Sequence, residues 1–92
     1  MASVSITSPL GGTTVARQFT ATGTYSPFAN GDAKPCVHMD DANGQVALAA
    51  IKTNGVGGWT GKFTMTANYV GLILVAELTA TDAIESNINV QG

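Results

Sequence analysis

A regular alternation of apolar and polar residues is the feature that most constrains the fold of this chain. In the segment 59–67, every second residue is apolar or glycine, and threonines and a lysine separate them. Segments 4–7, 18–25 and 87–90 repeat this period of two. Because successive side chains of a β-strand point to opposite faces, the period indicates strands with one buried face. The many threonines suit the outer face, since their branched side chains favour an extended backbone.

Three further segments are interpreted as strands. Residues 36–40 follow a proline, and residues 45–52 return after the turn Asp-Ala-Asn-Gly at 41–44. Segment 45–52 contains good helix formers, but the flanking turns leave room for only about two helical turns, so we interpret it as a returning strand. Residues 72–81 are nearly all apolar, which predicts a central strand covered on much of both faces. Residues 82–86 are expected to turn the chain before the last strand.

Together these segments predict an all-β, antiparallel β-sandwich of about seven strands. Short strands separated by turn signals at this spacing are typical of two packed antiparallel sheets. The chain has 92 residues, 45% of them hydrophobic, which suits a single domain over residues 1–92. The same composition excludes a disordered tail, and a charged fraction of only 11% argues against a coiled coil.

Charge and hydropathy exclude two classes of partner. The chain has only 4 lysine and arginine residues and a formal net charge of -2, so it offers no basic surface to nucleic acid or to an anionic membrane. The longest apolar stretch, 70–76, is far shorter than the roughly 20 residues of a membrane-spanning helix. We therefore expect neither nucleic-acid binding nor membrane insertion. The first residues lack the basic segment of a secretory signal, since the first basic residue is Arg17.

The residues that could carry catalysis lie close together in one predicted strand. Cys36, His38 and Asp40 share a face, but side chains at such spacing point outward side by side. We therefore expect Asp40 to continue a solvent-facing row, without converging on the imidazole as a catalytic triad requires. Structural zinc sites usually need four ligands, and the chain has one cysteine and one histidine. The sequence predicts no catalytic site and no cofactor.

Calcium is the metal for which the sequence offers the most ligands. Asp40, Asp41 and Asn43 cluster in one turn, Asp32 lies in the preceding loop, and Asp82 ends another predicted strand. Oxygen ligands on loops can hold Ca²⁺, which takes 6 to 8 of them. Turns favour the same residues for their own hydrogen bonding, however, and no full calcium-loop spacing is present. We expect no metal site.

Aromatic residues are the candidates for contact with a glycan or protein. Trp59 shares the phase of the apolar residues in its strand, which predicts a place in the core. Tyr25 and Phe28 flank the long loop 26–35, and Tyr69 lies in another loop. We treat these three rings as possible ligand contacts, with capping of the ends of the core as the alternative.

Three short patterns recur in a known family. Ile-Thr-Ser-Pro at 6–9 is followed by glycine and valine, Gly-Trp occurs at 58–59, and a segment from Gly71 ends in Thr-Ala-Thr-Asp at 79–82. Together they resemble the bacterial immunoglobulin-like (Big-type) modules that occur in tandem in surface proteins, adhesins and secreted polysaccharide-degrading enzymes. The family usually has Gly-Asn after the aspartate, where this chain has residues 83–85. It also often has a tyrosine after the glycine, a place for which Tyr69 is the nearest candidate.

The resemblance implies an immunoglobulin-like fold and a non-catalytic role, and it implies no ligand. We expect a spacer or presentation module in a larger extracellular or cell-surface protein, with a protein or glycan partner still to be identified. Two alternatives stay open: a carbohydrate-binding accessory module of a polysaccharide-degrading enzyme, and a decoration domain on a phage virion. In each case the domain would form part of a larger multidomain or virion assembly.

Overall fold

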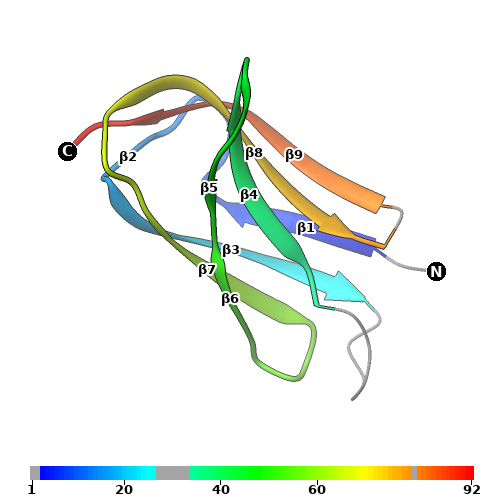
Figure 1. Ribbon diagram of the computed structural model, residues 1–92. Helices are drawn as coiled ribbons and strands as arrows, with labels where there is room; N and C mark the ends of the chain where they lie inside the picture. The colour runs from blue at the N-terminus through cyan, green and yellow to red at the C-terminus, as the bar shows by residue number, and fades with distance from the viewer. Residues whose placement is uncertain (1–2, 27–33, 80) are drawn as a thin grey trace.

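The computed structural model describes residues 3–26, 34–79 and 81–92, and these ranges contain nine β-strands and no helix. Two sheets pack against each other (Figure 1). The four-stranded sheet has the order β1-β3-β7-β6, and its strands are antiparallel. Its members are β1 (Ser3–Ser8), β3 (Gln18–Ser26), β6 (Ala50–Thr53) and β7 (Gly58–Thr64).

The five-stranded sheet has the order β2-β9-β8-β4-β5. Its neighbours are antiparallel except for β2 and β9, which run parallel. The members are β2 (Thr14–Val15), β4 (Cys36–Asp41), β5 (Gly44–Leu48), β8 (Tyr69–Leu78) and β9 (Thr81–Val90). The all-β sandwich predicted from the sequence is thereby confirmed. The described residues contain no helix that is long and apolar enough to cross a membrane.

The core lies between the inner faces of the two sheets. Trp59 is 1% exposed and therefore belongs to the core, as its phase predicts. The strand predicted to lie centrally also does so, because β8 is the middle member of the five-stranded sheet. The largest fully buried side chains come from four strands, one in the four-stranded sheet and three in the five-stranded sheet: Trp59, Phe63, Met39, Leu72, Leu74, Ile88, Val37 and Val90.

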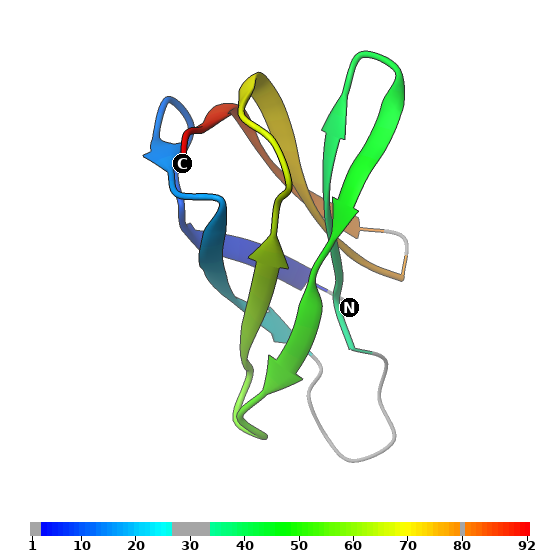
Figure 2. The same cartoon turned by 60° about the vertical axis from the view of Figure 1, so that its left-hand side comes forward.

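The predicted strand 45–52 is divided between the two sheets. Its first part, β5, pairs with β4, and its second part, β6, pairs with β7. Figure 2 shows this green segment passing from one sheet to the other. At the crossing, Ala49 is buried and its N–H donates to the carbonyl of Val37 at 2.9 Å. This division, together with the two-residue β2, accounts for nine strands where about seven were expected.

The turn expected at 82–86 is wrong, because β9 already begins at Thr81. Ala83 and Ile84 pair with Ala76 and Val75 of β8. The chain reverses at Thr79, which has a positive φ of 56°. By contrast, the predicted turn at 41–44 is confirmed as the two-residue connection between β4 and β5.

A close approach between β1, β3 and β7 fixes the position of the core tryptophan. The Nε1–H of Trp59 donates to the carbonyl of Ser5 at 3.1 Å. Gly23, the register partner of Trp59, lies directly beneath this contact. A Cβ at position 23 would lie 2.5 Å from the indole ring and closer still to the Ser5 carbonyl. The glycine is therefore required by space, because the indole occupies the volume of a side chain at that position.

Candidate functional site

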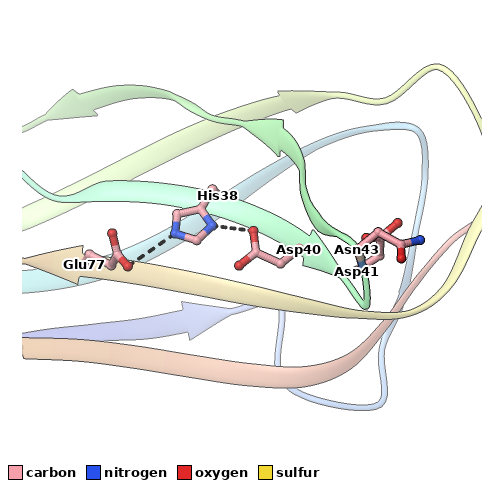
Figure 3. A network of polar contacts seen from close by, with 5 residues as sticks. All are labelled: His38, Asp40, Asp41, Asn43 and Glu77. Carbon is pink, nitrogen blue, oxygen red and sulfur yellow. Dashed lines mark hydrogen bonds and ion pairs between the residues drawn. The ribbon is translucent and has the colours of Figure 1, made fainter.

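In the described part of the structure, one histidine lies between two carboxylates and contacts both of them. His38 and Asp40 lie on β4, and Glu77 lies on the neighbouring strand β8 (Figure 3). His38 Nδ1 lies 2.6 Å from Asp40 Oδ1, and His38 Nε2 lies 3.5 Å from Glu77 Oε1. An ionised carboxylate can only accept, so the Nδ1–H donates to Asp40. The expectation that Asp40 points outward without approaching the imidazole is therefore wrong, because its carboxylate contacts the ring of His38.

The environment of the imidazole favours its protonated form. The His38 side chain is only 12% exposed, and this burial opposes protonation. The hydrogen bonds and negative charges of Asp40 and Glu77 favour protonation more strongly, so the pKa of His38 is raised above its ordinary value of 6.5. Both ring nitrogens face carboxylates. The arrangement therefore stabilises an imidazolium on the outer face of the sheet. Cys36, two residues earlier on the same strand, is exposed.

The acidic residues considered for calcium serve separate purposes. Asp41 Oδ1 accepts the backbone N–H of Asn43 at 2.7 Å, which closes the turn between β4 and β5. Asp40 contacts His38, and Asp82 lies opposite Glu77 on β9. Within the ranges that the structure describes, no group of three or more His, Cys, Asp or Glu residues could hold a metal ion. Asp32 lies outside the described residues.

The structure describes two of the three aromatic residues proposed as ligand contacts, and these two differ in burial. Tyr25 belongs to the buried core, so its ring offers no exposed platform. Tyr69 is half-buried at the start of β8 and packs against the core. Phe28 lies outside the described residues. Phe19 and Phe63 stack on each other with ring centroids 5.0 Å apart. In the described part of the chain, every aromatic side chain is buried or half-buried.

A shallow hollow of about 290 Å³ lies beside the turn that joins β6 and β7. Lys52, Asn54 and Thr60 contribute to its wall. Asn54 Oδ1 accepts the backbone N–H groups of Val56 and Gly58, each at 2.9 Å. The asparagine therefore shapes the turn, and its carbonyl oxygen is already used for this purpose.

One member of the histidine cluster was missed by sequence reasoning. Glu77 is 39 residues from His38, and only the pairing of β4 with β8 brings it near the ring. The alternation places Glu77 on the outer face of its strand, which is the one available signal. The register that sets Cys36 opposite Glu77 is a property of the assembled sheet.

Comparison with known proteins adds a structural likeness. No family model and no curated protein matches the chain. A similar fold occurs in an engineered protein, a Northeast Structural Genomics Consortium target whose crystal structure was determined at 1.98 Å. The TM-score is 0.65 and the sequence identity is 19%, with 100% of this chain matched. The chain spans 20% of that protein's length. At this identity the likeness concerns the fold alone.

Proposed function

We propose that this chain is an immunoglobulin-like module of the bacterial Big type, acting as a non-catalytic spacer or presentation domain in a larger extracellular or cell-surface protein. The observation that carries the proposal is the position of the two ends of the fold. The described chain enters the sandwich at one end of β3 and leaves at the other, which is the geometry that a spacer needs.

The strand order supports an immunoglobulin-like topology. In that fold, strands A, B, E and D form one sheet, and G, F and C form the other, to which C′ is added in some members. The four-stranded order β1-β3-β7-β6 corresponds to A-B-E-D, and β9-β8-β4-β5 corresponds to G-F-C-C′. The short β2 lies beside β9 as an additional strand. The buried tryptophan lies on β7, whereas antibody domains carry theirs on strand C.

The separation of the ends follows from the register. Ser3 pairs with Ser26 at the last residue of β3, whereas Arg17 immediately precedes its first. Gly92 lies beside Arg17, and both Gly92 N and Arg17 Nε donate to Asn68 Oδ1. The two ends are therefore separated by the length of β3, roughly 30 Å for nine extended residues. Figure 1 shows β1 starting on the right and the C-terminus on the left.

The outer face of the four-stranded sheet suits a passive module. Its exposed positions on β3 and β7 are mostly threonines, with one lysine. Small hydroxylated side chains expose little apolar surface, so they offer little to an adventitious partner. The engineered protein of similar fold is about five times longer than this chain, so there a domain of this fold forms one part of a larger protein. Both facts favour a modular role.

Concatemers test the spacer role. One, two and three copies, joined by the same short linker, are compared by small-angle X-ray scattering. Because the long axis of the domain is 37 Å, each added copy should extend the maximum dimension by about that length. A three-copy protein with long glycine–serine linkers serves as the flexible control. Increments close to the 21 Å and 18 Å short axes would mean that the copies fold back on each other, and the proposal would then fail.

The carbohydrate-binding alternative makes a different prediction. It requires retention of the purified domain on an insoluble polysaccharide, with the loss of that retention in the variant Tyr69→Ala. Because Tyr69 is half-buried, the matched control is Val70→Ala, which removes the exposed neighbouring side chain. The spacer proposal expects no retention of the wild-type domain on any of a panel of such polymers. Retention that Tyr69→Ala abolishes and Val70→Ala preserves would replace the spacer proposal.

A further inference from the structure

The charges of this domain are divided between its two sheets. The strands of the five-stranded sheet contain five acidic residues and no lysine or arginine. The strands of the four-stranded sheet contain two lysines and no acidic residue. The domain therefore presents one acidic and one basic sheet, although its net charge is only -2.

A row of three apolar residues and His38 crosses the outer face of the acidic sheet. The register places Ile84 of β9 opposite Val75 of β8, Val75 opposite His38 of β4, and His38 opposite Leu48 of β5. Directly opposed residues share a face, so these four side chains form one line across four strands. With strands spaced 4.7–4.9 Å apart, the line is about 15 Å long. Leu48 is 59% exposed and Ile84 is 55% exposed, so both ends of the row are accessible to solvent.

Carboxylates lie on both sides of this row. On one side, Glu77 of β8 and Asp82 of β9 are register partners. On the other side, Asp40 of β4 lies opposite Ile73, which is 38% exposed and widens the apolar surface. In the middle of the row, His38 contacts both Asp40 and Glu77, so its ring is held in place before any partner arrives (Figure 3).

We propose that this outer face of β4, β5, β8 and β9, which we call the acidic face, is a docking surface for a protein partner that presents apolar side chains flanked by lysine or arginine. Of the six large hydrophobic side chains that are exposed in the described residues, three lie on this face. Apolar side chains would cover the row, and cationic groups would meet the carboxylates beside it. This inference holds whether or not the domain acts as a spacer.

A second copy of the chain fits this face less well. Two acidic faces brought together would oppose Asp40, Glu77 and Asp82 of one copy to the same carboxylates of the other, and like charges in contact are unfavourable. The outer face of the four-stranded sheet offers Lys52 and Lys62 but carries none of the exposed large hydrophobic residues of the described chain. Neither arrangement supplies both apolar and cationic groups.

The probe for this proposal is a yeast-displayed library of a small helical protein with one randomised face. The library is sorted for binding to the purified wild-type domain, without selection for any particular surface of it. We expect most of the recovered clones to be enriched in apolar residues together with lysine or arginine. Their affinity should fall at least tenfold for the double variant Leu48→Ser/Ile84→Ser, and it should remain unchanged for Val56→Ser, which alters an exposed valine in the turn between β6 and β7.

A second variant tests the electrostatic part. Glu77→Gln/Asp82→Asn removes two charges with little change in shape, so the affinity of the same clones should fall and become less sensitive to salt. Circular dichroism of every variant establishes that it is folded. Clones that bind Leu48→Ser/Ile84→Ser as tightly as wild type, or that lack excess lysine and arginine, would overturn the proposal. Sedimentation of the wild-type domain as a dimer that the same double variant dissociates would assign the face to a second copy instead.

Discussion

Replacing Gly23 by alanine tests how tightly strands β1, β3 and β7 pack around the tryptophan. The new Cβ would lie 2.5 Å from atoms Cε2 and Cζ2 of the Trp59 ring, with the Ser5 carbonyl nearer still. Carbon atoms pack best at about 3.5–4.0 Å, so the ring would have to retreat by about 1 Å. The Ser5 carbonyl would have to move as well, and both groups belong to the hydrogen bond of 3.1 Å between them.

The expected loss in the free energy of unfolding follows from these two effects, the displaced ring and the broken hydrogen bond. Overpacking of a well-filled core costs about 1–3 kcal/mol. Breaking a part-buried hydrogen bond and leaving its donor unsatisfied costs about 1–3 kcal/mol more. A domain of this size has a free energy of unfolding of roughly 5–14 kcal/mol, so a loss of roughly 2–6 kcal/mol is a large share of it. The melting temperature should fall by about 10 °C or more.

The assay is urea unfolding followed by circular dichroism, with Gly61→Ala as the matched control. Gly61 lies on the adjacent strand β7, and a Cβ there would lie 2.9 Å from Cδ1 of Ile51 and 3.0 Å from Cβ of Ala49. The end of the isoleucine side chain can rotate away and Ala49 has to shift by only a few tenths of an ångström, so we expect a cost of about 1 kcal/mol. If Gly23→Ala costs no more than Gly61→Ala, the close approach at Gly23 does not determine stability and the reasoning is refuted.

Three further substitutions test the core, the charged cluster and the turn. Trp59→Ala should lower the free energy of unfolding by about 3–5 kcal/mol, and an unchanged melting temperature would place the ring outside the core. Because the pKa of His38 is raised in the folded state, its protonation stabilises the fold fully below pH 6.5, and this contribution is lost as the pH rises through the raised value. His38→Gln should therefore lower the melting temperature more at pH 5.5 than at pH 8.5; an equal loss at both would contradict the pKa assignment. Thr79 has a φ of 56°, which β-branched residues rarely adopt. Thr79→Asn should therefore raise the free energy of unfolding by about 1 kcal/mol, as measured by urea unfolding. A lower free energy of unfolding would show that the threonine side chain makes a contact that the fold needs.

Much of the fold could be predicted because the alternation is strong where one face of a strand is buried. In β7, Trp59, Gly61 and Phe63 face inward, and the residues between them are threonine and lysine. The first half of β9 was missed because its alternation breaks down after Ala83. Ile84 faces outward and is exposed, while Glu85 occupies an inward phase and accepts the backbone N–H of Gly11. Apolar residues outside and polar residues inside cancel the sequence signal.

The division of segment 45–52 between two sheets and the contact of Glu77 with His38 were both missed from the sequence, for a different reason. Both depend on which strands become neighbours in space, and the period of a single segment contains no information on that choice. The phase of Ala49 gives no warning that the chain leaves one sheet for the other at this point. In the same way, the spacing of His38 and Asp40 does not reveal the third group, Glu77, which comes from a strand much later in the chain.

The parallel pairing of β2 with β9 determines how the domain would respond to a pulling force. Hydrogen bonds from Asn89 N to the Thr13 carbonyl and from Gln91 N to the Val15 carbonyl join the two strands. Tension on the two ends of the chain would draw β2 toward its own start and β9 toward its own end. Since the strands run in the same direction, this motion is a shear that loads their hydrogen bonds together, so the sandwich could not be unzipped from its C-terminal edge one bond at a time.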